Sequence, residues 1–333
     1  MQHDLCLVIG GSGFVGQHLV QQLLAAGYTV RVFDRQPLYA LPVEFILGDL
    51  RDRSAVQRAC AGVGTVFHSA SMVDWRAGNR EVLYAINVQG TRHVIDACCA
   101  QPGTRLIYTS SIDVVFDGSP IRAGDERLPY ARRHLDDYGQ TKMLAEQAVL
   151  AAHGQNGLTT CALRLAGVYG PGDVYRLPTI VAMARQGRML RIGDGRARFN
   201  HVYVENAAHA HLCAAERLGT GSPLAGKPYF IIDHPAHNFF DFVESFPRAM
   251  GLPTAQRAIP FPIAYILAIL MEGWAQLRRS RAIALTRYIV TSTCRDFYFN
   301  GSNAARDLAY TPPISEREAF QRTLAWLQAD TSG

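Results

Sequence analysis

The chain has 333 residues, a length that fits about two domains, and its composition excludes several classes of protein. Hydrophobic residues make up 48% of the chain and charged residues 18%, which predicts a folded protein with a sizeable core. The formal net charge is +5, but the basic residues are scattered and form no long Lys/Arg block. Nucleic-acid binding is therefore not predicted.

The cysteines and the N-terminal residues predict a cytoplasmic location. The seven cysteines form no C-x-x-C pair and lie mostly in apolar runs, which favours free thiols in a reducing compartment over disulfides or a zinc site. Residues 1–4 lack the basic region and long apolar stretch of a signal peptide. No segment reaches the ~20 consecutive apolar residues of a membrane-spanning helix.

Strand-length apolar runs alternate with helical patterns along the first half of the chain. The predicted strands are 5–9, 29–33, 44–47, 63–68, 105–109 and 159–165. The predicted helices are 17–26, which ends at Gly27, 54–61 with Ser54 as N-cap, 87–100 and 138–153. This alternation predicts an α/β fold with a doubly wound parallel sheet and right-handed crossovers.

After about Gly170 the regular alternation stops, and Pro, Gly and aromatic residues become more frequent. Shorter and less regular elements are predicted there. We expect a coenzyme-binding domain at 1–170 and a smaller substrate-binding domain at 171–333, with segments near 200–235 returning to the first domain. Residues 202–204 and 230–232 are predicted strands that either rejoin the main sheet or form a small parallel pair.

A glycine-rich turn follows the first predicted strand and opens the first helix. Its sequence contains G-x-G-x-x-G, in which missing side chains allow a tight turn and close approach of a pyrophosphate to the backbone. A helix N-terminus supplies free N–H groups for the phosphates. A glycine turn without a ligand is the alternative, but its place between strand and helix favours a Rossmann-type dinucleotide site. The predicted contacts are Gly10, Gly11, Ser12, Gly13, Phe14, Val15 and Gly16.

Asp34 lies 18 residues beyond Gly16, at the end of the second strand. A carboxylate there accepts hydrogen bonds from ribose hydroxyls and repels a 2′-phosphate, so NAD is predicted over NADP. Arg35 could attract that phosphate, which leaves NADP as an alternative. Asp49 follows the third strand and is expected at the adenine, or else it caps a turn. Leu50, Ser69, Ala70 and Ser71 complete the predicted coenzyme site.

A catalytic constellation is predicted around Tyr138 and Lys142, which share one helix face because they are four residues apart. A neighbouring ammonium lowers the pKa of a phenol from its ordinary value near 10, which lets the phenol transfer protons. Ser110 and Ser111 follow the fifth strand at the ligand-binding end of the sheet. Asn87 is expected to anchor Lys142 through a water molecule. An ordinary surface pair of Tyr and Lys is the alternative interpretation.

These residues together resemble the extended short-chain dehydrogenases/reductases, and more closely the 3β-hydroxysteroid dehydrogenase group. The resemblance implies that Ser111 is the catalytic serine with Ser110 beside it, and that Tyr138 and Lys142 are the proton-transfer pair. It also implies a homodimer formed through the helix that carries Tyr138. Further motifs that support it are Tyr108-Thr109-Ser110-Ser111, Leu128-Pro129-Tyr130, Ala145-Glu146, Ala162-Leu163-Arg164, Tyr169-Gly170-Pro171-Gly172-Asp173, Tyr203-Val204-x-Asn206 and Ala305-Arg306-Asp307-Leu308.

The substrate expectation also comes from resemblance. Residues 115–118 and 124–130 are similar to sterol-4α-carboxylate 3-dehydrogenases and bacterial 3β-hydroxysteroid dehydrogenases, which implies oxidation of a sterol 3β-hydroxyl to a ketone. If a 4-carboxylate is present, the β-keto acid product loses carbon dioxide. Reduction of 2-alkyl-3-oxoalkanoates is the alternative activity. A nucleotide-sensing protein without turnover and a sugar-nucleotide epimerase are further alternatives.

The most apolar segment is Ile259–Trp274, followed by Arg278, Arg279 and Arg281. One interpretation is a core helix of the second domain. The other is a partly exposed element at the substrate mouth that rests reversibly on a membrane, because residues 263–271 are apolar all round and the arginines suit anionic headgroups.

Overall fold

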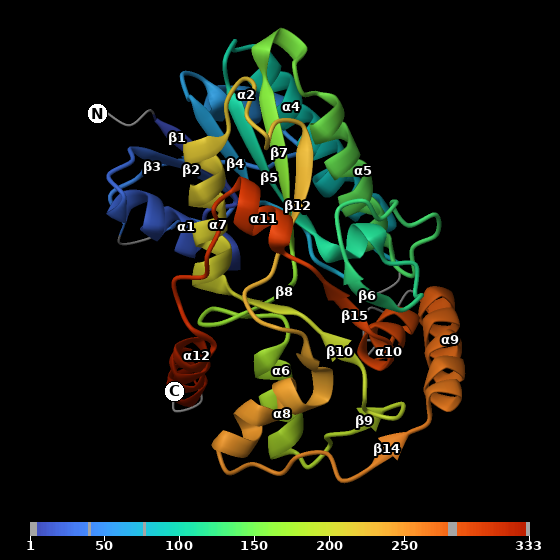
Figure 1. Ribbon diagram of the computed structural model, residues 1–333. Coiled ribbons are helices and arrows are strands. Elements are labelled where there is room, and N and C mark those ends of the chain that lie inside the picture. The colour runs from blue at the N-terminus through green and yellow to red at the C-terminus, as the bar shows by residue number, and fades with distance from the viewer. Residues whose placement is uncertain (1–4, 39–40, 76–77, 279–284, 331–333) are drawn as a thin grey trace.

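A seven-stranded parallel sheet forms the centre of the computed structural model, which describes residues 5–38, 41–75, 78–278 and 285–330 (Figure 1). The strand order is β12-β7-β5-β4-β1-β2-β3. The strands are β1 (Cys6–Ile9), β2 (Val30–Asp34), β3 (Glu44–Leu47), β4 (Thr65–His68), β5 (Arg105–Ser111), β7 (Thr159–Leu165) and β12 (Lys227–Ile231). The order reverses between β1 and β4, so a crevice opens there at the carboxyl ends of the strands. The predicted doubly wound sheet is confirmed.

Helices cover both faces of this sheet because each central strand is apolar on both sides. Cys6 and Val8 of β1 face one core cluster, and Leu7 and Ile9 face the other. The first face packs against α1 (Phe14–Ala25) and α7 (Val204–Arg217), which also contact each other. The second packs against α2 (Arg53–Cys60), α4 (Gly90–Cys99) and α5 (Asp137–Ala151).

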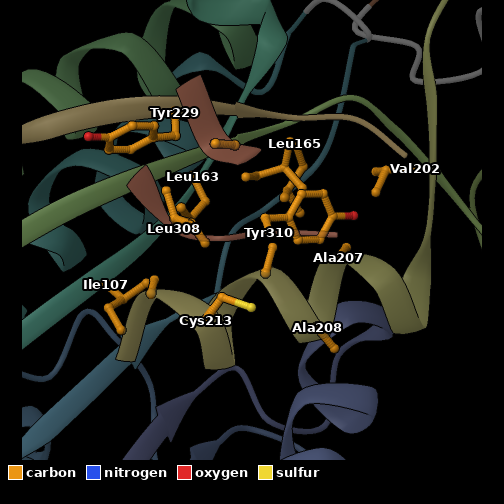
Figure 2. Close-up of a cluster of buried hydrophobic side chains, with 14 of the residues drawn as sticks. Ile107, Leu163, Leu165, Val202, Ala207, Ala208, Cys213, Tyr229, Leu308 and Tyr310 are labelled. Atoms are coloured by element: carbon orange, nitrogen blue, oxygen red, sulfur yellow. The ribbon is translucent and has the colours of Figure 1, made fainter. Parts of the chain in front are cut away.

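Alanines let α7 lie close to the sheet. Figure 2 shows Ala207 and Cys213 on this helix facing Leu163 of β7, with Leu308 from a distant part of the sequence beside them. All four side chains are buried. A helix from beyond residue 170 therefore completes one layer of the main sheet.

The remaining elements form small sheets and helices, most of them beyond the carboxyl ends of the main strands, whereas α11 (Ser302–Asp307) lies beside β12 (Figure 1). They are α3 (Arg80–Leu83), β6 (Ile121–Gly124), β8 (Gly167–Tyr169), α6 (Leu177–Arg185), β9 (Arg191–Ile192), β10 (Arg198–Phe199), β11 (His201–Tyr203), β13 (His237–Asn238), α8 (Phe239–Ala249), β14 (Ala258–Ile259), α9 (Phe261–Arg278), α10 (Arg287–Cys294), β15 (Phe297–Phe299), α11 (Ser302–Asp307) and α12 (Glu316–Asp330). The small sheets pair β11 with β8, β14 with β9, and β13-β10-β15-β6. Thus the predicted strand 230–232 rejoins the main sheet as β12, whereas 202–204 forms the small parallel pair.

Several boundaries differ from the sequence predictions. Asp52, not Ser54, caps α2, because its carboxylate accepts the Ala55 N–H at 3.0 Å. Val204 begins α7 and is not in a strand. The prediction of short helices after Gly170 is wrong, since α7, α9 and α12 have 14, 18 and 15 residues.

The apolar segment 259–274 falls mainly in α9, at the outer edge of the molecule (Figure 1). Ala264 and Ala268 are fully buried and pack near Val290 of α10. On the other side, Ile266, Leu270 and Trp274 are 58%, 62% and 56% exposed. The core-helix interpretation therefore holds for one face of α9 only, because the opposite face is exposed. Within the part of the chain that the structure describes, no helix has both the length and the apolar character needed to cross a bilayer.

Candidate active site

The glycine-rich turn has the close packing that dinucleotide binding requires. Gly10 has φ +87°, and a Cβ on it would lie 2.5 Å from the Ala70 nitrogen. A Cβ on Gly16 would lie 2.0 Å from the Gly10 carbonyl oxygen, and one on Gly11 would lie 2.6 Å from Val32. Gly13 is the N-cap of α1, so the first N–H groups of this helix face the turn. The backbone of this turn therefore leaves room for a pyrophosphate at the N-terminus of α1.

Asp34 links the second strand to this turn. Its carboxylate accepts the Ser12 N–H at 3.0 Å and the Arg35 N–H at 2.6 Å. The Arg35 guanidinium is exposed and lies 3.9 Å from Asp49. Asp49 also accepts the Arg51 N–H at 2.9 Å and pairs with that side chain, which lowers the pKa of the carboxyl. Asp49 thus stabilises a turn, as one interpretation held, and its contact with adenine stays a prediction.

One elongated cavity of about 560 Å³ joins the turn to the proposed catalytic residues. It runs from Asp34 and Arg35, past Ser69, Ala70 and Ser71, to Tyr138 and Lys142. All the predicted site residues line it except Gly11 and Asn87, which lie behind its wall. Gly10, Ser12, Gly13, Phe14, Val15, Gly16, Asp49, Leu50, Ser110 and Ser111 are the other lining residues from that prediction.

The two serines play different structural roles because β5 continues to Ser111, two residues beyond its predicted end. Successive side chains of a strand point to opposite faces. Ser110 donates a hydrogen bond to Glu146, which is buried in an ion pair with Arg164 at 2.7 Å. Its hydroxyl therefore holds α5 to the sheet, and a part for Ser110 in catalysis stays a prediction. Ser111 donates to Asp113 at 2.7 Å inside the cavity.

Asn87 lies in a π-helical turn, Tyr84–Gln89, that precedes α4 and replaces the start of the single predicted helix 87–100. Such turns often occur at functional sites. The Asn87 amide donates to the Thr141 hydroxyl at 3.1 Å and accepts the Met72 N–H at 2.8 Å. Asn87 thereby fixes the helix turn next to Lys142. A water molecule between Asn87 and Lys142 stays a prediction.

Tyr138 and Lys142 are both buried on the cavity side of α5. The Lys142 ammonium donates to the Thr109 carbonyl oxygen at 2.5 Å and lies 4.3 Å from the centre of the Tyr108 ring. Burial lowers the pKa of Lys142 to about 7, although Glu146 and Asp113 oppose this shift. Burial, assisted by Asp113, raises the pKa of Tyr138, while a hydrogen bond with Ser111 lowers it. The phenol is therefore protonated at neutral pH in the coenzyme-free chain.

A buried acidic group that the sequence analysis missed completes this end of the cavity. Asp113 accepts the Ser111 hydroxyl and, at 2.7 Å, the Tyr288 hydroxyl. Burial raises the pKa of Asp113. Burial and the nearby Asp113 raise the pKa of Asp136, the N-cap of α5, to about 8. The spacing Ser111-x-Asp113 was the available signal, but Tyr288 is 175 residues away and only the fold brings it here.

Aromatic rings line the space in front of Tyr138. Trp75 stacks on Tyr288 with ring centroids 6.0 Å apart and packs edge-on against Tyr138 and Tyr175. Arg176 also lines this end of the cavity. These residues were not identified from sequence, because aromatic residues at irregular spacing carry no local pattern. A flat apolar ring system fits such a wall.

The geometry supports proton transfer to or from the oxygen of an alcohol or ketone whose carbon is held against a bound dinucleotide. The phenol of Tyr138 and the hydroxyl of Ser111 share one end of the cavity, and the glycine turn is at the other. Among the described residues, no group of three or more His, Cys, Asp or Glu side chains could hold a metal ion.

Comparisons with known proteins agree with this site. The model of the 3-beta hydroxysteroid dehydrogenase/isomerase family matches residues 7–263. The chain is 38% identical to the Homo sapiens "sterol-4-alpha-carboxylate 3-dehydrogenase, decarboxylating", over 97% of this chain and 88% of that protein. It is 37% identical to the 2-alkyl-3-oxoalkanoate reductase of Stenotrophomonas maltophilia, over 96% of this chain and 98% of that one. Among solved structures, the Thermus thermophilus UDP-glucose 4-epimerase in complex with NAD shares the fold, with a TM-score of 0.72, 21% identity and coverage of 97% and 99% of the two chains.

Proposed function

Because the chain belongs to the 3-beta hydroxysteroid dehydrogenase/isomerase family, we propose that it is an NAD-dependent dehydrogenase that oxidises the 3β-hydroxyl of a sterol, and of a 4-carboxysterol in particular, to a 3-ketone. The observation that carries the proposal is the single cavity joining the glycine turn to Tyr138 and Ser111. The aromatic wall around Trp75 supports a large apolar substrate.

In the proposed reaction, Tyr138 takes the proton of the substrate hydroxyl while a hydride leaves the carbon that carries this hydroxyl. When bound, NAD supplies the hydride acceptor, so the products are the ketone, NADH and one proton. Ser111 holds the substrate oxygen, and Asp113 orients the Ser111 hydroxyl at 2.7 Å. In the coenzyme-free chain burial raises the pKa of the Tyr138 phenol, contrary to the lowering expected from the sequence. In the proposed reaction the Lys142 ammonium stabilises the phenolate once coenzyme and substrate are bound.

A second candidate is reduction of a 2-alkyl-3-oxoalkanoate, the activity in the name of the Stenotrophomonas relative. The protonated Tyr138 phenol supports this direction, because reduction requires an acid that donates a proton to the developing alkoxide. Both substrates carry a secondary alcohol or ketone on a lipid. The same residues therefore serve both reactions, with Tyr138 accepting the proton in oxidation and donating it in reduction.

The experiment is a comparison of coenzyme turnover with three substrate sets. A 3β-hydroxysterol, a 4-carboxysterol and a 2-alkyl-3-hydroxy acid are each offered with NAD, and formation of NADH is followed by absorbance. We expect turnover of at least one of them that is lost in Tyr138→Phe. NAD binding without turnover of any of the three would favour the nucleotide-sensing alternative.

We also propose that α9 rests on a membrane surface. Its exposed row includes Ile266, Leu270 and Trp274, and the sequence continues with Arg278, Arg279 and Arg281. Arg279 and Arg281 lie outside the described residues, as does the side chain of Arg278. A poorly soluble lipid substrate delivered from a bilayer avoids an aqueous step, and α9 is close to the cavity. Its Glu272 accepts hydrogen bonds from Arg287, next to the cavity residue Tyr288, at 2.6 and 2.7 Å.

A homodimer through α5 stays a prediction.

A further inference from the structure

A guanidinium group lines the reaction end of the cavity and forms no ion pair within 4.0 Å among the described residues. The charge of the buried Asp173 acts on this group, but the Asp173 carboxylate accepts the backbone N–H groups of Tyr175, Arg176 and Leu177. Arg176 precedes α6 and donates from Nη2 to the carbonyl oxygens of Gly167 and Val168, each at 3.3 Å. Its Nε is buried and has no hydrogen-bond partner. Burial lowers the pKa of Arg176, but a guanidinium remains protonated at neutral pH.

The other cationic groups of the cavity have defined positions. Among the described residues, the cationic side chains lining it are Arg35, Lys142 and Arg176. Arg35 lies 3.9 Å from Asp49 at the adenosine end. Lys142 bonds to Thr109 beside Tyr138. Arg176 is therefore the cation that remains available to a substrate.

Arg176 lines the same cavity as Tyr138 and Ser111. It also interacts electrostatically with the Tyr288 hydroxyl, which donates to Asp113 at 2.7 Å. The absence of a side chain at Gly167 makes room for two neighbours, because a Cβ there would lie 2.6 Å from the Phe199 ring and 2.9 Å from Nη1 of Arg176.

We propose that Arg176 binds a carboxylate on the carbon next to the reacting alcohol or ketone carbon of the substrate. This inference rests on the proposed function, whose two candidate substrates, a 4-carboxysterol and a 2-alkyl-3-oxoalkanoate, both carry a carboxylate at that position. A buried cation is costly unless an anion pairs with it, and a guanidinium can bind a carboxylate through two parallel hydrogen bonds. Arg176 then makes the enzyme selective for β-hydroxy acids over neutral alcohols.

The test compares acid and methyl ester pairs. One pair is a 4-carboxysterol and its methyl ester, and the other is a 2-alkyl-3-hydroxy acid and its methyl ester. Each compound is offered with NAD to wild-type protein, Arg176→Leu and Arg176→Lys. NADH formation gives kcat and KM separately. Arg185→Leu, at the other end of α6, is the matched control. NAD affinity is measured by calorimetry, and melting curves check that each variant is folded.

We expect wild-type protein to prefer the acid of at least one pair, and Arg176→Leu to lower kcat/KM for that acid by roughly 30-fold or more, as for removal of one partner of a buried charged pair. Turnover of the ester, NAD affinity and the Arg185→Leu control should stay unchanged, and Arg176→Lys should retain part of the preference. The pair that shows the preference identifies the lipid skeleton.

Other results would overturn the assignment of Arg176. Equal use of acid and ester by wild-type protein, or an equal loss for both in Arg176→Leu, would exclude carboxylate binding. A fall in NAD affinity with unchanged acid preference would assign Arg176 to the coenzyme. If wild-type protein binds NAD but oxidises none of the four compounds, the proposed function itself fails.

Discussion

Tyr138 is the residue on which the proposed chemistry depends most directly. Replacing it with Phe removes the proton-transfer group but keeps the ring that packs against Trp75. We expect turnover to fall by about 10²–10⁴-fold, the usual contribution of general acid–base catalysis, with NAD affinity unchanged. Steady-state kinetics and calorimetry measure the two effects. Tyr229→Phe, a buried tyrosine remote from the cavity, is the control and should keep its turnover. Near-normal activity of Tyr138→Phe would contradict the assignment.

Asp136 predicts a specific dependence of stability on pH. Its pKa is about 8 in the folded protein and near 3.8 in the unfolded chain, so the folded state binds one more proton between these values. The stabilisation is complete below about pH 4 and is lost as the pH rises through about 8. Asp136→Asn keeps the cap on α5 but removes this titration. We expect its melting temperature to fall less than that of the wild type between about pH 5 and pH 8.

Asp96→Asn, on the exposed side of α4, is the control for that experiment and should follow the wild-type profile, because Asp96 is not among the groups that shift the pKa of Asp136. Parallel melting profiles for wild type and Asp136→Asn would show that Asp136 is ionised in the folded protein.

Asp34 should set the choice between NAD and NADP. Asp34→Asn removes the charge but can still accept the Ser12 N–H, so the glycine turn keeps its anchor. We expect the ratio of kcat/KM for NADP to that for NAD to rise by roughly 10-fold or more, because repulsion of the 2′-phosphate is lost. Asp96→Asn, on the outer surface of α4, should leave the ratio unchanged. A wild-type protein that already prefers NADP would show that Arg35 outweighs Asp34.

At the scale of elements, the main sheet could be predicted because short, mostly apolar runs alternate with helical patterns, and the bounds of the strand 159–165 are reproduced. The end of β5 could not. Ser110 and Ser111 read as a polar loop, yet the ladder with β7 continues to the pair Ser111 and Leu165. That extension points the two serine hydroxyls to different partners, Ser110 to Glu146 and Ser111 to Asp113. The π-helical turn that carries Asn87 likewise has no periodic signal that separates it from an ordinary helix.

The helix α9 provides a test of membrane contact. Replacement of Ile266, Leu267 and Leu270 by Ser removes part of the exposed apolar row without touching its buried alanines. We expect wild-type protein to float with anionic vesicles and the triple variant to stay behind, folded and active on a detergent-solubilised substrate. Each arginine near anionic headgroups contributes about 1 kcal/mol to binding, and high salt should weaken binding because it screens this attraction.

A second variant and a size measurement make that test specific. The control replaces Leu47, Val82 and Leu190, three exposed apolar residues elsewhere, and should float like the wild type. If wild-type protein fails to float and its gel-filtration size falls on replacing the α9 residues, a second copy covers α9 and the membrane proposal fails.

For the whole molecule, the order of the chain explains why the substrate end was harder to predict than the coenzyme end. The glycine turn and Asp34 are close in sequence, so one local pattern identifies both. The reaction end combines Trp75, Asp113, Tyr138, Arg176 and Tyr288, which come from separate elements. Only their positions in the fold bring them together. The division of the chain into two domains at residues 170 and 171 stays a prediction. Two elements from beyond that point, β12 and α7, lie in the main sheet and against it.

This interleaving predicts that the protein unfolds as one unit and that NAD stabilises all of it. The chain leaves the main sheet after β7, returns with α7 and β12, and returns again with α11, which contacts β12. NAD at about 100 times its Kd should raise the free energy of unfolding by about 2.7 kcal/mol. We expect circular dichroism and tryptophan fluorescence to show coincident transitions that shift together. Trp274 of α9 and Trp326 of α12 report on regions outside the main sheet. NADP at the same concentration is the control and should produce a smaller shift. A fluorescence transition that stays in place while the circular dichroism transition moves would mean that the smaller elements unfold independently of the coenzyme-binding sheet.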